Sequence, residues 1–331
     1  MEYRQLGKSD VKVSAVTLGT WAIGGWMWGG QDESDAIDAI KRSVDLGVTS
    51  IDTAAVYGFG KSEELVGKAV GDRRDKVQIL TKYGLRWDLD SGGVEHFDSQ
   101  DNEGNPITIR KYAGRDSVIE ECERSLKRLG TDYIDLYQCH WRDRSTPLEE
   151  TFEAIDKLLK DGKILAAGVS NFSAEEIETA NKVVPLAAAQ PPFSMVNRGA
   201  EKDVIPYCHQ NGIGVIVYSP LERGLLTGKV TLDREFPPDD HRSQNPFFSR
   251  ENRERVLDFL GKVRPIAEAH DATLAQVVVN WTIHRPGITA ALVGARNREQ
   301  AEQNAAAGEL ELSDEEMNTI DALVDDLKLD V

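Results

Sequence analysis

Residues 18–30 read LGTWAIGGWMWGG, directly after the first segment that has the character of a β-strand, residues 14–20. A doubly wound dinucleotide-binding sheet needs the glycine pattern GxGxxG at this turn. The glycines of this stretch have a different spacing. The sequence therefore disfavours a doubly wound sheet and favours a closed barrel.

Short apolar runs that end in polar residues alternate with amphipathic segments along the whole chain. The amphipathic segments carry apolar side chains at helical spacing, for example Ile37, Ile40 and Val44. Eight such units predict an α/β fold, a (β/α)8 TIM barrel that forms a single domain over residues 1–331. The predicted strands are residues 14–20, 49–54, 77–83, 134–140, 164–171, 186–194, 214–220 and 288–295.

Four further segments do not belong to the repeating units. Residues 1–12 have turn residues between two stretches of strand-like alternation, and we expect an N-terminal β-hairpin that closes the barrel floor. Residues 86–114 and 221–250 follow the third and seventh predicted strands and are too long for plain connections, so we expect active-site loops. Residues 313–327 begin with a capping box and predict a C-terminal helix.

The composition limits the classes of partner. Lys and Arg number 39 against 56 Asp and Glu, a formal charge of −17, which repels nucleic acid and anionic lipid. Cys122, Cys139 and Cys208 have neither metal-site nor disulfide spacing, and no segment resembles a signal core or a membrane span. We therefore expect a cytoplasmic protein, plausibly a monomer, with no metal and no membrane or nucleic-acid partner.

Ionisable residues end three consecutive predicted strands. Asp52, Lys82 and His140 hold these positions, and Tyr57 lies on the loop after the first of them. The carboxyl ends of parallel barrel strands meet on one face. Each residue alone has an ordinary structural role, but together they suit the reduction of a carbonyl. The phenol donates a proton, the ammonium lowers the pKa of the phenol, the carboxylate holds the ammonium, and the imidazole orients the substrate oxygen.

The loop after the second strand also contains a fragment that resembles a phosphate-binding loop. Residues 51–64 read IDTAAVYGFGKSEE, but a Walker A pattern that ends at Ser62 needs glycine at position 55, where Ala55 stands. We therefore interpret Ser62 as the N-cap of the next helix.

Residues at the ends of the later strands suit a nucleotide cofactor. Amide and hydroxyl side chains suit a carboxamide, a tyrosine can stack on a flat ring, and glycines let the backbone approach a pyrophosphate. A strand-to-helix junction with arginine suits an anion. Ser170, Asn171 and Gln190 suit the carboxamide, and Tyr218 suits the ring. Gly224 and Gly228 suit the pyrophosphate, and residues 294–298 form the junction that suits an anion.

These motifs, in this order, resemble the aldo-keto reductase family over almost the whole chain. The blocks are LGTW (18–21), IDTAAVYGFGKSEELVGKAV (51–70), LTKYG (80–84), TDYIDLYQCHW (131–141), GKILAAGVSNFS (162–173), YSPLERGLLTGK (218–229) and VGARNREQAEQN (293–304). The opening at residue 19 is most similar to the bacterial general-stress-type NADPH-dependent branch.

The resemblance implies NADP(H)-dependent reduction of aldehydes or ketones, with Tyr57 as general acid and Asp52, Lys82 and His140 completing a catalytic tetrad. For such a reductase we expect a substrate pocket formed by Trp21, Trp28, Tyr57, Trp87, His140 and Trp141; core packing is the alternative role of the tryptophans, particularly Trp21 and Trp141. The implied cofactor residues are Gly19, Thr20, Trp21, Asp52, Ser170, Asn171, Gln190, Tyr218, Ser219, Pro220, Leu221, Gly224, Leu226, Lys229, Gly294, Ala295, Arg296, Gln300, Gln303 and Asn304.

The sequence departs from the familiar family pattern in two places, and two other functions stay open. Arg142 follows the His-Trp pair, and residues 88–106 form an acidic, glycine-rich insertion; both bear on which small carbonyl compound is the substrate. The alternatives are an NADPH-binding barrel that senses redox state with little turnover, and an aldolase in which Lys82 forms a Schiff base.

Overall fold

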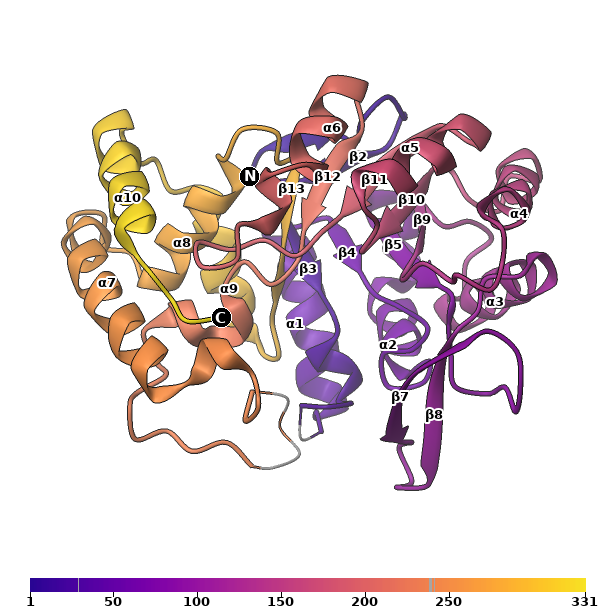
Figure 1. Cartoon of the computed structure of the whole chain (residues 1–331), viewed down its shortest axis with the longest axis horizontal. Helices are drawn as coiled ribbons and strands as arrows, with labels where there is room; N and C mark the ends of the chain where they lie inside the picture. Colours follow the sequence, from indigo (N-terminus) through magenta and orange to yellow (C-terminus); the bar gives the residue numbers. More distant parts are fainter. Residues whose placement is uncertain (29, 238–239, 241) are drawn as a thin grey trace.

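Eight parallel strands form a closed barrel in the computed structural model, which describes residues 1–28, 30–237, 240 and 242–331 (Figure 1). Each strand falls within one of the eight predicted segments, so the predicted (β/α)8 barrel is confirmed. In chain order the barrel strands are β3 (Val16–Gly19), β4 (Ser50–Asp52), β5 (Gln78–Tyr83), β9 (Leu136–Cys139), β10 (Ala167–Ser170), β11 (Leu186–Gln190), β12 (Gly214–Val217) and β13 (Ala290–Gly294).

Helices surround the barrel and follow its strands in turn (Figure 1). The predicted capping box at Ser313 is present, and a second capping box begins at Ser173. None of the helices in the described ranges is long and apolar enough to cross a membrane. The helices are α1 (Glu33–Asp45), α2 (Lys61–Val70), α3 (Arg115–Leu129), α4 (Leu148–Lys160), α5 (Ala174–Val183), α6 (Val204–Asn211), α7 (Arg250–Ala269), α8 (Leu274–Ile283), α9 (Arg298–Ala307) and α10 (Asp314–Asp326).

The predicted N-terminal hairpin is present and closes the barrel floor. It pairs β1 (Tyr3–Gln5) with β2 (Lys12–Ser14). Leu6 and Val13 are fully buried and pack with residues of the barrel interior. A side chain at Gly7 would lie 2.6 Å from the carbonyl oxygen of Ala187, so only glycine permits this close approach. The interior is therefore sealed at the end opposite to the strand carboxyl ends.

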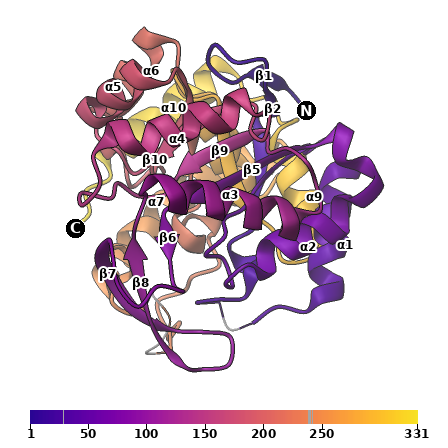
Figure 2. The same ribbon diagram turned by 90° about the vertical axis from the view of Figure 1, so that its right-hand side faces the viewer.

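The segment predicted as a long loop after the third strand is instead a small antiparallel sheet. It consists of β6 (Leu85–Arg86), β7 (Val94–Gln100) and β8 (Pro106–Lys111), in the order β6-β8-β7. Figure 2 shows β7 and β8 projecting away from the barrel strands. The loop prediction was wrong here because strand pairing within an insertion depends on contacts that no local pattern specifies. We call β7, β8 and the turn between them the β7–β8 hairpin.

The second predicted long loop, residues 221–250, contains two short 3-10 helices. They are η4 (Glu222–Thr227) and η5 (Pro246–Phe248). Residues 238, 239 and 241 of this loop, and residue 29 of the stretch that follows β3, lie outside the described residues.

A buried carboxyl on α3 supports the end of β5. The Glu121 side chain accepts hydrogen bonds from the Gly84 amide at 3.0 Å and the Ser117 hydroxyl at 3.2 Å. Burial raises the pKa of Glu121 from 4.5 to about 7, against the opposing attraction of Arg86. Because the unfolded chain releases this proton more readily than the folded protein, stability decreases as the pH rises between these two values.

We predict that Glu121→Gln stabilises the protein at high pH but not at low pH. Each unit of pKa shift corresponds to about 1.4 kcal/mol, so the gain approaches about 3 kcal/mol above pH 7 and vanishes below about pH 4.5. Urea unfolding of both proteins across this range measures the gain. Glu120→Gln, which replaces an exposed carboxyl on the same helix, is the matched control. A stability difference that does not change with pH would contradict the assignment.

Candidate active site

A cavity of about 670 Å³ opens at the carboxyl ends of the barrel strands. Most of the predicted site residues line it, and they come from the ends of every barrel strand except β5 and from the loops that follow. The predicted residues in its lining are Gly19, Thr20, Trp21, Trp28, Asp52, Tyr57, His140, Trp141, Ser170, Asn171, Gln190, Tyr218, Ser219, Pro220, Leu221, Gly224, Lys229, Gly294, Arg296, Gln300, Gln303 and Asn304.

Four of the predicted residues are not part of the described lining: Lys82, Trp87, Leu226 and Ala295. Leu226 and Ala295 are fully buried in the hydrophobic core. Trp87 packs against Phe59, with ring centroids 5.6 Å apart, and does not border the cavity. Their roles in binding cofactor or substrate therefore stay predictions.

Lys82 and Asp52 form an ion pair inside the barrel wall. The Lys82 ammonium lies 2.5 Å from Asp52 Oδ1 and also donates to the Thr53 carbonyl at 2.8 Å. Its third partner is the Tyr57 hydroxyl at 3.4 Å. The Lys82 side chain has no exposure and that of Asp52 has 3%. Lys82 therefore lies behind Tyr57 and does not itself line the cavity.

The second oxygen of Asp52 is also held. Gln190 Nε2 donates to Asp52 Oδ2 at 2.9 Å, and Gln138 Nε2 does so at 3.4 Å. Buried ion pairs are tolerated when further hydrogen bonds satisfy each charge. Burial lowers the pKa of the Lys82 ammonium, and the contact with Asp52 opposes this change. The position of the cation is fixed by β4 and β5, which pair in the barrel.

Tyr57 and His140 face each other at the inner end of the cavity. Their ring centroids are 5.7 Å apart and the rings are nearly perpendicular. Burial, with the added charge of Asp52, raises the pKa of Tyr57 above its ordinary value. The expectation that Lys82 lowers this pKa is therefore wrong for the free protein, because desolvation of the phenolate dominates. Burial, together with Lys82 and His96, lowers the pKa of His140, so its imidazole is neutral near pH 7.

Ser62 is not the N-cap that the sequence predicts. Helix α2 begins two residues earlier than this cap would place it, at Lys61, and Gly60 occupies the cap position with φ +98°. The Ser62 hydroxyl instead contacts the hydroxyls of Thr20 at 2.7 Å and Thr53 at 2.9 Å. Ser62 therefore ties α2 to the ends of β3 and β4.

Close backbone contact fixes the loop that carries Tyr57. A side chain on Gly24 would lie 2.9 Å from the Tyr57 carbonyl carbon, and one on Gly58 would lie 2.2 Å from the Gly24 oxygen. Asn102, in the turn of the β7–β8 hairpin, donates to the Gly58 carbonyl at 2.9 Å. The Tyr57 loop is thus held between the loop after β3 and the hairpin, which leaves its phenol little freedom.

The cavity also contains residues that the sequence did not indicate. His96 and Phe97 reach it from β7, and Arg223 and Arg242 from the loop after β12. The other unpredicted lining residues are Ala22, Trp26, Met27, Val56, Leu85, Thr227, Thr273, Ala275, Leu292 and Val293. Trp26 belongs to the tryptophan-rich run after β3 and could have been included on that signal, whereas His96 and Phe97 carry no local signal.

At the opposite end of the cavity, Arg296 holds the segment after β3. Its guanidinium donates to the Gln31 side chain at 2.8 Å and the Gly30 carbonyl at 2.5 Å. Gln31 in turn donates to the Arg296 carbonyl at 2.8 Å. Arg298, by contrast, pairs with Asp38 and Glu302 and is not in the described lining of the cavity.

The family model described as the Aldo/keto reductase family matches residues 15–325. The chain belongs to this family. The predicted family is thereby confirmed, and the match covers all eight barrel strands. Membership makes the protein an oxidoreductase that acts on carbonyl compounds with a nicotinamide cofactor.

Several characterised relatives of this aldo/keto reductase cover nearly its whole length. It is 40% identical over 328 residues to "Aldo-keto reductase YhdN" of Bacillus subtilis (strain 168), covering 98% of this chain and 94% of the relative. It is 37% identical over 315 residues to "NADH-specific methylglyoxal reductase" of Escherichia coli (strain K12), covering 93% and 94%. Among solved structures, glycerol dehydrogenase AKR11B4 from Gluconobacter oxydans has a TM-score of 0.88 at 38% identity, covering 98% and 95%.

Two features of the cavity suit a nicotinamide dinucleotide. Gly224 has φ +95°, and a side chain built there would meet nothing within 4 Å, which leaves open space beside the backbone. Arg223 Nε is buried without a hydrogen-bond partner among the described residues, an arrangement that suits a bound anion. The described part of the chain contains no cluster of three or more His, Cys, Asp or Glu that could hold a metal.

The side chains predicted to hold the carboxamide have most of their donors in use. Asn171 donates to the His140 carbonyl at 3.0 Å, and its oxygen accepts from the Tyr218 hydroxyl at 2.8 Å. Ser170 donates to the Gln190 carbonyl at 2.8 Å. Because a carboxamide oxygen has two lone pairs, Asn171 and Gln190 can still accept hydrogen bonds from an amide N–H.

Proposed function

We propose that this aldo/keto reductase reduces aldehydes or ketones to alcohols with NADPH, and that Tyr57 is the general acid. One observation carries the proposal: the Tyr57 phenol stands between the cavity and the buried Lys82 ammonium, 3.4 Å from it. When bound, the reduced nicotinamide supplies the hydride. The protein's own residues then have to supply a proton to the carbonyl oxygen and stabilise the charge that develops there.

Tyr57 can supply that proton although burial raises its pKa. The alkoxide formed by hydride addition is the conjugate base of an alcohol, a group about as weakly acidic as water. A phenol is a stronger acid than an alcohol, so proton transfer to the alkoxide is favourable. The Lys82 ammonium stabilises the phenolate that remains, and Asp52 keeps the ammonium in place.

His140 would orient the substrate. Its lowered pKa keeps the imidazole neutral, so one ring nitrogen carries a hydrogen and can donate to the carbonyl oxygen. Its perpendicular arrangement with Tyr57 allows both side chains to face the same oxygen. Two donors that converge on this atom polarise the carbonyl before the hydride arrives.

The preference for NADPH over NADH rests on Arg296. The partners of its guanidinium are a side-chain amide and backbone carbonyls, all neutral acceptors. A phosphate dianion forms stronger, charge-assisted hydrogen bonds with arginine, and would displace them. The relative from Escherichia coli is named NADH-specific, so cofactor choice varies among proteins this similar.

The geometry gives less support to a Schiff-base aldolase. An aldolase lysine must reach the substrate carbon as a neutral amine. Lys82 already donates to Asp52, Thr53 and Tyr57, and it is not among the described residues that line the cavity.

We predict that Tyr57→Phe lowers turnover on the order of a hundred- to ten-thousand-fold while NADPH affinity changes little, because only the proton donor is removed. NADPH oxidation with a small aldehyde measures turnover, and quenching of tryptophan fluorescence measures binding. Tyr207→Phe, on the surface helix α6, is the control and should retain wild-type rates. Near-normal reduction by Tyr57→Phe would refute the acid role. If the wild-type protein binds NADPH tightly but reduces no carbonyl compound, a redox sensor would be favoured instead.

We predict that Arg296→Ala weakens NADPH binding more than NADH binding, by at least about tenfold, because only NADPH carries the phosphate that arginine binds. Arg298→Ala is the matched control: it removes a neighbouring arginine that pairs with carboxylates outside the cavity. Dissociation constants for both cofactors measure the effect. Equal losses for NADPH and NADH in Arg296→Ala would contradict the assignment.

A further inference from the structure

The β7–β8 hairpin brings a histidine into the substrate end of the cavity. His96 lines the cavity and contacts Trp141 and Phe97, with ring centroids 5.2 and 4.9 Å away. Aromatic side chains form most of the surrounding wall, including Trp21 and Trp26. Besides Tyr57 and His140, His96 is therefore a polar group in a part of the cavity wall that contains several aromatic side chains.

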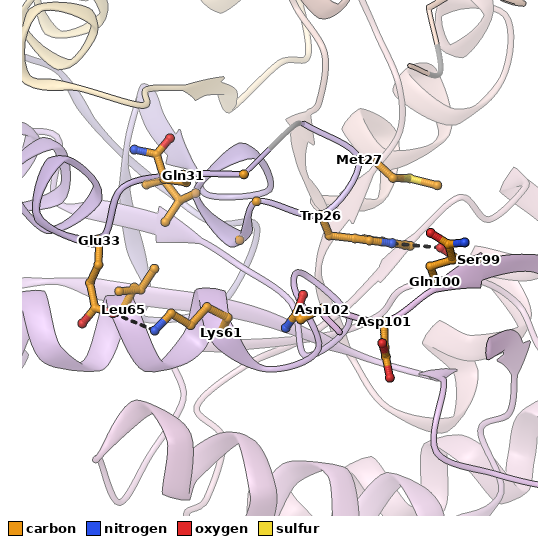
Figure 3. Close-up of a pocket in the computed structure, with 14 residues that line it drawn as sticks. Trp26, Met27, Gln31, Glu33, Lys61, Leu65, Ser99, Gln100, Asp101 and Asn102 are labelled. Carbon is orange, nitrogen blue, oxygen red and sulfur yellow. Dashed lines mark hydrogen bonds and ion pairs between the residues drawn. The ribbon is translucent and has the colours of Figure 1, made fainter. Parts of the chain in front are cut away.

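Two hydrogen bonds fix the hairpin to the loops of the active site. Trp26 Nε1 donates to Ser99 Oγ at 3.0 Å, and Asn102 Nδ2 donates to the Gly58 carbonyl at 2.9 Å. Figure 3, a close-up of a second pocket, shows Trp26 directed at Ser99, and Asn102 lines the same pocket. Gly58 directly follows Tyr57, so this bond fixes the hairpin relative to the proposed proton donor. A site held this way is pre-organised for recognition.

The imidazole of His96 is neutral near pH 7. Partial burial lowers its pKa, and Lys111 on β8 adds to this effect. A neutral imidazole has one donor and one acceptor nitrogen, so it can bind either a hydroxyl or a carbonyl oxygen. Trp141, whose ring His96 contacts, directly follows His140 in the chain, so His96 lines the same part of the cavity as the residue proposed to orient the substrate.

We propose that His96 determines specificity by hydrogen bonding to a second oxygen on the carbon next to the reacting carbonyl. The favoured substrates are then α-hydroxy or α-oxo carbonyl compounds. This inference rests on the proposed reductase function and specifies its substrate class. A polar group in an apolar wall discriminates strongly, because a substrate that lacks the oxygen leaves the imidazole unpaired on binding.

A matched pair of substrates tests the proposal. Lactaldehyde and isobutyraldehyde have nearly the same shape, but the first carries a hydroxyl where the second carries a methyl group. We compare kcat/KM for both with NADPH in the wild-type protein, His96→Leu and His96→Gln. His209→Leu, which changes an exposed histidine on α6, is the control. Circular dichroism checks that each variant is folded.

We expect the wild type to prefer lactaldehyde by at least about tenfold, the effect of one buried hydrogen bond. His96→Leu should lose this preference through a lower rate on lactaldehyde alone, whereas His96→Gln and the control should retain at least part of it. Equal losses on both aldehydes, or an unchanged preference in His96→Leu, would overturn the role of His96. If His96→Leu does not fold, equal losses on both aldehydes in a folded His96→Gln would overturn it.

The same assay distinguishes failure of the role of His96 from failure of the reductase function. A wild-type protein that reduces both aldehydes with equal efficiency contradicts only the role of His96. A wild-type protein that reduces neither, nor any other carbonyl compound, contradicts the reductase function itself.

Discussion

The ion pair between Lys82 and Asp52 lies inside the barrel, where charges are costly to bury. It is tolerated because each partner has a further hydrogen bond. Lys82 donates to the Thr53 carbonyl, and Asp52 accepts from Gln190. Both residues belong to neighbouring strands, so the barrel register fixes their separation without help from any loop. The positive charge behind Tyr57 is therefore as rigid as the barrel itself.

Barrel strands hold one part of the site, and loops and the β7–β8 hairpin hold the other. The ion pair and Gln190 are on barrel strands, whereas the aromatic wall comes from the segment after β3 and the β7–β8 hairpin. The close packing of Gly24 against Gly58 and the bond from Asn102 join these segments to the Tyr57 loop. This arrangement separates the proposed proton transfer, which a whole family can share, from substrate recognition, which an insertion can change.

The sequence predicts strand-end residues well and inserted residues poorly. Asp52, Lys82 and His140 could be brought together from the sequence because parallel strands present their ends on one face. His96 and Phe97 could not, since their approach depends on pairing between β7 and β8 and on docking to Gly58. The N-cap role predicted for Ser62 is wrong because its hydroxyl contacts Thr20 and Thr53. Thr20 is far away in the sequence, and Thr53 carries no local pattern that indicates the contact. The raised pKa of Tyr57 was missed because burial is invisible in a charge pattern.

The central claim is that the buried ion pair acts on substrate only through Tyr57. A double-mutant cycle tests it directly, with Lys82→Met and Asp52→Asn made together so that no unpaired charge remains buried. The cycle combines this change with Tyr57→Phe and measures kcat for one aldehyde. If the claim is correct, removing the ion pair costs little further activity once Tyr57 is replaced. Losses that multiply in the combined variant would show that the ion pair and Tyr57 act independently, and would contradict the account.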